Sequence, residues 1–359
     1  MKRIIILRPD NIGDFVMFGG VLECYAELFH GYAIDLICNR AVMPLAKNSP
    51  FIENVFSYSD QVWSRKCFLQ RWAFFRNLRK YHYEKAIYPV YSRSMDSERL
   101  MDHIHAKEKI VFDGDFGCDV SGQRFSRNSR YSTIIAGTDV ECNEVERNFE
   151  FVRKLGYRGD AIEVNSRVWL SESDRRRAAE ILNKYGLKKK EFVLLCPGAR
   201  QLQRLWPVTK WRELVRFLLT STSRKVVFCG DVCDRLIIDD IVEPFDHESR
   251  IINLAGLLSL NEFAGIINNA ELLIGVDSGP IHIAAALKIP NICIAGGGHG
   301  RRFYPYGDLR MNRIVYKQLD CFGCNWHCKY NKAKCIDMNT VTDVVREISF
   351  LREHQGFAF

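Results

Sequence analysis

The feature that most constrains the fold is a stretch near the C-terminal end that alternates between strand and helix patterns. Leu272–Val276 is a short apolar run without polar alternation, which is typical of a strand covered on both faces. The polar turn 277–279 follows it, and Pro280 favours the start of a helix that continues over Ile281–Leu287. Asn291–Ala295 is the next apolar run. This order predicts a parallel α/β sheet, with the turn at the carboxyl end of a strand, where such sheets bind ligands.

The turn itself allows two interpretations. Backbone N–H groups and the positive end of the helix dipole suit a phosphate group, while Ser278 adds a hydroxyl and Gly279 permits close approach. His282 lies one turn into the predicted helix. The alternative is an ordinary strand-to-helix turn in which Asp277 or Ser278 caps the helix. The turn alone leaves both interpretations open.

Length and composition limit the class of protein. A chain of 359 residues, 47% of them hydrophobic, is expected to form two domains. It holds no apolar run near the roughly 20 residues that cross a membrane, and its first strand runs into Arg8 and Pro9 without a signal-peptide core. We therefore expect a cytoplasmic protein. The net charge of +8 indicates an anionic partner such as a nucleotide, a glycolipid or a membrane surface, and we expect no nucleic acid.

Both halves of the chain alternate predicted strands and helices, which favours two doubly wound α/β domains. We expect a first domain over 1–169, a second over 170–338, and a terminal helical segment over 339–359 that packs back on the first domain. The first domain opens with an apolar strand, a polar loop and a helix over Phe15–His30. Asp14, at the head of this helix, is either its N-cap or a carboxylate presented at the top of the sheet.

A basic and aromatic segment, Val62–Lys85, is distinctive in the first half. It interleaves arginine and lysine with tryptophan, phenylalanine and tyrosine. Such a segment either lies on an anionic membrane face or forms a crossover helix that packs its aromatic side chains on the sheet. In the second case its charges are simply solvated.

A cysteine cluster lies near the C-terminus. The chain holds 13 cysteines, an odd number that fits a reducing compartment better than a disulfide framework. The cluster consists of Cys321, Cys324, Cys328 and Cys335. The first pair has the spacing of half a zinc site, whereas the second pair is spaced more widely. A structural zinc or iron site, free thiols and disulfides therefore all remain open.

Three stretches taken together resemble glycosyltransferase family 9, whose best-known members are ADP-heptose:lipopolysaccharide heptosyltransferases. The first is Arg8–Asp14, with the sequence RPDNIGD. The second is Pro197–Arg200, followed by Arg204–Pro207 and Trp211, and the third is Gly275–His282. The resemblance spans nearly the whole chain. It implies a GT-B architecture, in which two Rossmann-like domains face a cleft, with the acceptor on the first domain and the nucleotide sugar on the second.

The resemblance also implies roles on the acceptor side and a mechanism. Asp14 matches the family's proposed base, which takes the proton of the acceptor hydroxyl. Arg8 and Asn11, in the same loop, are acceptor-side candidates. The implied reaction inverts the transferred sugar centre and needs no catalytic metal or other cofactor.

On the donor side the resemblance implies a set of binding residues in the second domain. These are Arg204, Asp231, Leu258, Asp277, Ser278, Gly279 and His282. Arg204 occupies the position at which many members have a phosphate-binding lysine. Asp231 occupies the position of an acidic residue that binds the ribose hydroxyls, and Leu258 lies near the position that contacts the adenine. Ser278 replaces the more usual threonine. Arginine in place of lysine at 204 and aspartate in place of glutamate at 231 are the two departures that weaken the case for ADP-heptose itself.

The expected function is transfer of a heptose or related sugar from an ADP-sugar to a lipopolysaccharide-type glycan or glycolipid. The enzyme is then expected in the cytoplasm, peripheral to the inner membrane. One alternative is a glycosyltransferase of the same fold with another nucleotide sugar or a protein acceptor. The other is a nucleotide-binding module without catalysis, in which Asp14 is only a helix cap.

Overall fold

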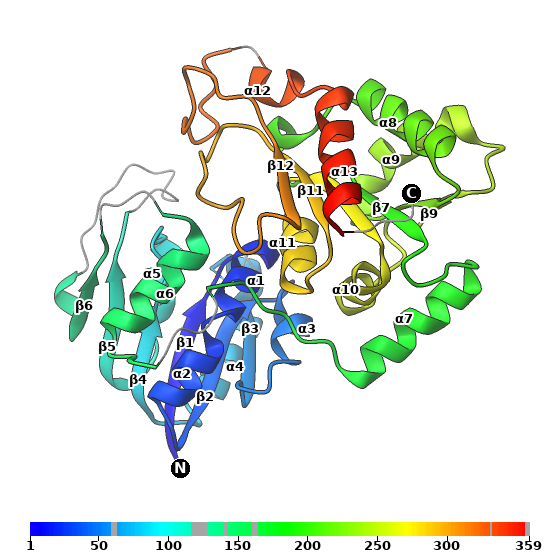
Figure 1. Ribbon diagram of the computed structural model, residues 1–359. Coiled ribbons are helices and arrows are strands. Elements are labelled where there is room, and N and C mark those ends of the chain that lie inside the picture. The colour runs from blue at the N-terminus through cyan, green and yellow to red at the C-terminus, as the bar shows by residue number, and fades with distance from the viewer. Residues whose placement is uncertain (59–62, 116–127, 139–141, 160–163, 331, 356–359) are drawn as a thin grey trace. The chain divides into compact units, whose positions relative to one another are not determined.

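The computed structural model describes residues 1–58, 63–115, 128–138, 142–159, 164–330 and 332–355 (Figure 1). The chain divides into two compact units, Met1–Val164 and Asn165–Phe359. The division falls a few residues before the predicted boundary at 169, next to residues 160–163, which lie outside the described part of the chain.

In the first unit a parallel sheet carries helices between its strands. Six described strands lie in the order β3-β2-β1-β4-β5-β6. The strands are β1 (Lys2–Arg8), β2 (Tyr32–Asn39), β3 (Asn54–Tyr58), β4 (Tyr83–Tyr88), β5 (Ala106–Asp113) and β6 (Thr133–Ala136). The helices are α1 (Ile12–Gly19), α2 (Leu22–Leu28), α3 (Met43–Ala46), α4 (Phe68–Leu78), α5 (Met95–Asp102) and α6 (Glu144–Lys154). All of the strand pairs are parallel.

The second unit repeats this arrangement. Its described strands lie in the order β12-β11-β10-β7-β8-β9 and pair in parallel. They are β7 (Phe192–Cys196), β8 (Lys225–Phe228), β9 (Ile251–Asn253), β10 (Leu272–Val276), β11 (Asn291–Ile294) and β12 (Asn312–Val315). The helices are α7 (Glu172–Lys184), α8 (Val208–Ser221), α9 (Arg235–Val242), α10 (Leu260–Asn269), α11 (Gly279–Ala286), α12 (Lys334–Asp337) and α13 (Val341–Gln355). The predicted α/β class, with two Rossmann-like domains, is confirmed.

Each sheet has one point at which the strand order reverses. In the first unit the chain passes β1, β2 and β3 in one direction and returns to place β4 on the other side of β1. In the second unit β10 lies on the other side of β7 in the same way. Doubly wound sheets bind ligands beyond the carboxyl ends of the two strands at such a switch point. The loops after β1 and β4, and after β7 and β10, are therefore the places to search for sites.

The C-terminal helix α13 belongs to the second unit. Val344, Ile348 and Leu351 are buried in the core that includes Ile292 of β11 and Val315 of β12. The apolar side chains of this helix are therefore covered by its own sheet. Packing of 339–359 back on the first domain stays a prediction.

The predicted helix over Phe15–His30 is two helices. Helix α1 begins at Ile12 and ends at Gly19, and α2 begins at Leu22. The N-cap residue of α1 is Asn11, so Asp14 is the third residue of the helix. The interpretation of Asp14 as the N-cap is therefore wrong.

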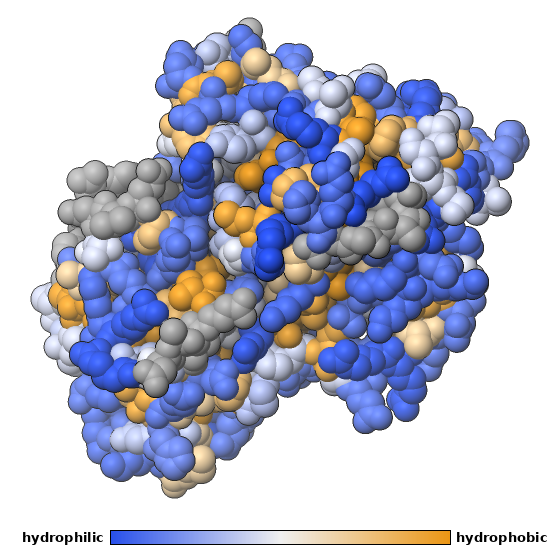
Figure 2. Space-filling model, viewed as in Figure 1, coloured by the Kyte–Doolittle hydropathy of each residue, from blue (hydrophilic) through white to orange (hydrophobic). Residues whose placement is uncertain are grey.

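None of the helices in the described ranges is both long and apolar enough to cross a bilayer. Figure 2 shows a face that is mostly hydrophilic, with apolar residues gathered in small patches.

Candidate functional site

The switch point of the second sheet is tightly packed at the carboxyl ends of β7 and β10. The Ser278 hydroxyl, just beyond β10, donates to the carbonyl oxygen of Gly198, beyond β7, at 3.2 Å. A Cβ atom on Gly198 would lie 2.1 Å from Cγ of Asp234, so only glycine fits there. Burial raises the pKa of that Asp234 carboxyl. The two loops therefore form one joined surface at the edge of the sheet.

Asp277 is the buried charge at this switch point. Its side chain lies 3.5 Å from Nη1 of Arg204, measured to Oδ2, and 3.8 Å from Nε2 of His282, measured to Oδ1. Although burial raises the pKa of Asp277, the neighbouring His282 and the charge of Arg204 hold it below its usual range. The His282 ring is itself stacked on Tyr306 and lies 3.0 Å from its hydroxyl oxygen. Asp277 is thus ionised near pH 7 and organises two basic side chains.

Helix α11 begins at Gly279, two residues after Asp277. Ser278 is its N-cap residue, in an extended conformation, but its hydroxyl donates to backbone oxygens of Gly198 and Val276. The Ser278 side chain accepts no capping hydrogen bond from the helix backbone, so it is not serving as the usual capping acceptor. The first N–H groups of the helix are the ones that a phosphate oxygen would accept from.

The sequence did not indicate two residues that contact Arg204. His299 follows β11, and its Nδ1 lies 3.0 Å from Nη2 of Arg204. Trp326, between two of the clustered cysteines, lies with its ring centroid 5.4 Å from the Arg204 guanidinium carbon. The only sequence signal was the glycine run at 296–298 before His299. The structure brings Arg204, Asp277 and His282 together as predicted and adds these two residues.

Asp231 and Leu258 lie at the carboxyl edge of the same sheet, after β8 and β9. Asp231 is exposed, and its Oδ1 accepts a hydrogen bond from the N–H of Val232 at 2.6 Å. Leu258 is half-buried, just before the N-terminus of α10. Exposed apolar side chains that the sequence reasoning had not selected are found in the same loops and in α9. They are Val232, Leu236 and Leu257.

At the switch point of the first sheet the arginine is buried. Arg8 has a side chain only 1% exposed, and its Nε lies 2.9 Å from Oδ2 of Asp10. It also donates to Asn148 Oδ1 at 3.2 Å and to the main-chain oxygen of Asp14 at 3.4 Å. Arg8 therefore holds the loop together, and its assignment as an acceptor-side candidate stays a prediction. Asp14 is half-buried, and Asn11 is exposed.

Comparison with known proteins identifies the family. The family described as "Glycosyltransferase family 9 (heptosyltransferase)" matches residues 71–331, which is more than half of the chain. The chain belongs to glycosyltransferase family 9. Lipooligosaccharide heptosyltransferase 2 of Haemophilus ducreyi is 31% identical to this family 9 chain over 300 residues, which cover 82% of each protein.

Two further relatives set the extent of the similarity. Lipopolysaccharide heptosyltransferase 3 of Escherichia coli K12 is 31% identical over 162 residues, so the family 9 chain spans less than half (45%) of that relative's length in this match. The structure of E. coli ADP-heptose lipopolysaccharide heptosyltransferase II superposes with a TM-score of 0.73 at 18% identity. It covers 99% of this chain and 100% of that one. At this identity the superposition shows a shared fold.

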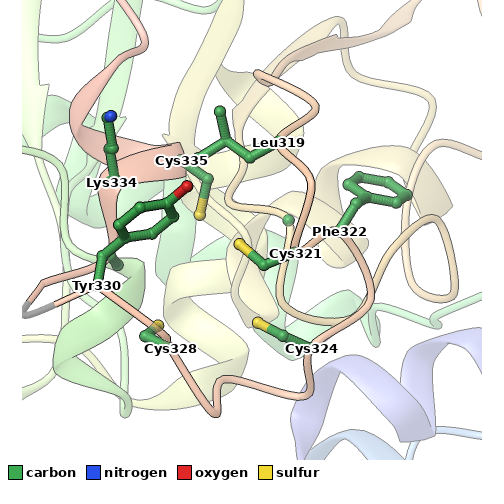
Figure 3. Close-up of a pocket in the computed structure, with 10 residues that line it drawn as sticks. Leu319, Cys321, Phe322, Cys324, Cys328, Tyr330, Lys334 and Cys335 are labelled. Atoms are coloured by element: carbon green, nitrogen blue, oxygen red, sulfur yellow. The ribbon is translucent and has the colours of Figure 1, made fainter.

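The four clustered cysteines of the family 9 chain line one cavity of about 10 Å³, the room of a single water molecule (Figure 3). They are free thiols, and burial, reinforced by the neighbouring thiols, raises the pKa of Cys321 and Cys328. Among the described residues no group of three or more His, Cys, Asp or Glu side chains is placed to hold a metal ion. The zinc or iron alternative stays a prediction, which metal analysis of protein purified under reducing conditions tests directly.

Proposed function

We propose that this family 9 chain transfers a heptose from ADP-heptose to a lipopolysaccharide-type glycan, with inversion at the transferred carbon and without a catalytic metal. The observation that carries the proposal is the switch point of the second sheet, where Arg204 and the N-terminus of α11 converge on Asp277. Positive charge at this place suits a diphosphate. The names of the relatives support the heptose and the lipopolysaccharide acceptor, and one of them names ADP-heptose as donor.

In the proposed reaction the second unit stabilises the leaving group. As the bond between the anomeric carbon and the diphosphate breaks, negative charge grows on the departing ADP. Arg204 and the first N–H groups of α11 would stabilise that charge. Asp277 keeps Arg204 and His282 in place, and the exposed Asp231 would accept hydrogen bonds from the ribose hydroxyls. Leu258, with Val232 and Leu257, would cover the adenine face.

The first unit is proposed to supply the base. Asp14 stands in the first turn of α1, in the loop that follows β1 at the switch point. Its carboxylate would take the proton of the acceptor hydroxyl while that oxygen forms the new bond to the anomeric carbon. One direct displacement of this kind inverts the carbon. Asn11, which is exposed beside it, is retained as the acceptor-side candidate.

A donor panel tests the proposal. Purified protein is incubated with ADP-heptose, UDP-glucose or GDP-mannose, with and without a truncated lipopolysaccharide, and nucleotide release and glycan mass are measured. We expect transfer from ADP-heptose that continues in the presence of EDTA. Transfer from another nucleotide sugar would replace the donor assignment, and binding of ADP without transfer or donor hydrolysis would favour the non-catalytic alternative.

We also propose that α4 rests on the anionic inner membrane surface, near a glycolipid acceptor. No acidic residue occurs between Asp60 and Glu84. Phe68, Leu69 and Trp72 are exposed apolar residues on this helix. Arg71 and Arg76 of this helix, with its C-cap residue Arg79, line a hollow of about 290 Å³ together with these aromatic rings and His103. Apolar insertion and charge attraction to anionic lipids would act together here.

Vesicle flotation tests the membrane contact. We expect binding to vesicles of phosphatidylglycerol and phosphatidylethanolamine, weak binding to phosphatidylcholine alone, and release at high salt. Replacing Arg71, Arg76 and Arg79 by glutamine should abolish the binding. The matched control replaces three exposed arginines of α7 (175–177), which removes the same charge from the other unit. Equal loss of binding in both variants would refute a specific role for α4.

A further inference from the structure

The Arg204 guanidinium is held at each of its three nitrogen atoms. Nε donates to Oε1 of Gln201 at 3.1 Å, and Nη1 donates to the main-chain oxygen of Asp277 at 2.9 Å. Nη2 lies 3.0 Å from Nδ1 of His299. The Arg204 side chain nevertheless remains 19% exposed. A guanidinium fixed in one orientation but still reachable from solvent is prepared for an anion, because binding then costs little further side-chain entropy.

The contacts of His299 fix the position of its ring proton. Arg204 Nη2 and Trp326 Nε1 both lie near the same ring nitrogen, Nδ1, at 3.0 and 3.4 Å. Both of these groups are donors only, so Nδ1 must carry a lone pair and the proton lies on Nε2. Burial, reinforced by the charge of Arg204, lowers the pKa of His299 to about 4. At neutral pH the imidazole therefore accepts a hydrogen bond from the guanidinium and adds no positive charge beside it.

Trp326 is brought to Arg204 by the C-terminal cysteine segment, Cys321–Cys335. The main-chain N–H of Asn325 donates to Gly298 at 2.7 Å, and that of Gly323 donates to Gly297 at 2.8 Å. Trp326 itself has a positive φ of 64°. A non-glycine residue is held in this uncommon conformation only where its surroundings determine it. The segment is thus anchored to the loop that carries His299.

The glycine run 296–298 makes room for this segment. A Cβ atom on Gly298 would lie 2.3 Å from Cδ2 of Trp326, and one on Gly296 would lie 2.8 Å from Cη2 of the same ring. A Cβ atom on Gly297 would lie 3.0 Å from Cδ2 of Phe322. A run of three glycines after a strand suggests a phosphate-binding loop, but here its lack of side chains is used to admit aromatic rings.

We propose that His299 and Trp326 are positioning residues that hold Arg204 for a nucleoside diphosphate. The C-terminal cysteine segment is then a wall of the donor site as well as a packing element. His299 supplies the acceptor that orients Nη2, and the Trp326 ring supports the guanidinium and orients His299 through its N–H. The inference rests on the proposed function in one respect only, namely that Arg204 meets the phosphates of the donor.

Binding of ADP and of adenosine to the whole protein tests the inference. We expect His299→Ala and Trp326→Leu to weaken ADP binding about tenfold, the effect of one lost hydrogen bond to a charged group. Adenosine carries no phosphate, so its affinity should not change. His299→Asn places an amide oxygen near the position of Nδ1 and should restore most of the ADP affinity. Trp326→Phe keeps the ring and loses only the N–H, so its defect should be smaller than that of the leucine variant.

The control is Leu309→Ala, which removes an exposed apolar side chain that belongs to neither proposed binding surface and should leave both affinities unchanged. Equal losses for His299→Asn and His299→Ala, or parallel losses of ADP and adenosine affinity, would overturn the positioning role. A wild-type protein that binds none of ADP, UDP and GDP would instead overturn the proposed function. Calorimetry for the nucleotides and ligand-observed NMR for adenosine provide the measurements.

Discussion

The two units have the same strand order, yet they use the arginine at their switch points in opposite ways. Arg8 is 1% exposed and is paired with Asp10 inside the first unit. Arg204 is 19% exposed, and its acid, Asp277, is the buried partner. In the first unit the charge stabilises the loop, whereas in the second it is oriented by the protein and left accessible. Shared topology therefore marks where a site lies but not which side chains serve it.

The difference in exposure follows from the position of each arginine relative to its sheet. Arg8 is the last residue of β1, a central strand, so its side chain is covered by the neighbouring elements. Arg204 lies in a short 3₁₀ turn, Leu202–Arg204, well beyond the end of β7. A long side chain in a loop can reach the edge of the sheet from outside. This contrast makes different predictions for the two units.

The largest expected effect is on turnover, in Asp14→Asn. Because Asn11 is the N-cap of α1, this change removes a carboxylate without removing a cap. If Asp14 is the base, turnover should fall roughly 100-fold or more while ADP affinity and melting temperature stay unchanged. Glu23→Gln, in the first turn of α2, is the matched control for the loss of a helix-terminal charge. An Asp14→Asn enzyme with near-normal single-turnover rates would exclude the base role.

The next effect separates the two arginines directly. Arg8→Ala leaves the Asp10 carboxylate without its buried partner and should lower the free energy of unfolding by about 3–5 kcal/mol. Arg204→Ala leaves the buried Asp277 with His282 as its remaining basic neighbour, so it should lower the free energy of unfolding by less than Arg8→Ala does. The same change should weaken ADP binding about tenfold or more. Urea unfolding and calorimetry on both variants measure the two effects. The comparison fails if Arg204→Ala destabilises the protein as much as Arg8→Ala does.

Local patterns were sufficient to predict the strands and the turn of the donor site. Leu272–Val276 has the residues of a buried strand, and the structure shows β10 over the same range. The turn that follows was predicted because its proline, glycine and acid act over a few residues. The contact of His299 with Trp326 was not predictable in this way, because it depends on two loops far apart in sequence packing through a glycine run. The burial of Arg8 was missed for the same reason, since Asn148 of α6 helps to cover it.

The smallest expected effect is a pH dependence of stability that belongs to the second unit. The pKa of His299 is lowered from its ordinary value of 6.5 to about 4 in the folded protein. Between these values the unfolded chain binds more protons than the folded chain, so the free energy of unfolding falls as the pH is lowered. The slope from this one group reaches about 1.4 kcal/mol per pH unit. His299→Asn removes the group, so the stability of this variant should decline less steeply than that of the wild type over this range.

Urea unfolding between these two pKa values measures both slopes, with His30→Asn as an exposed-histidine control that should follow the wild type. Parallel curves for wild type and His299→Asn would show that the imidazole is not buried beside Arg204, and would remove the distinction between an arginine oriented for a ligand and one that only stabilises its loop.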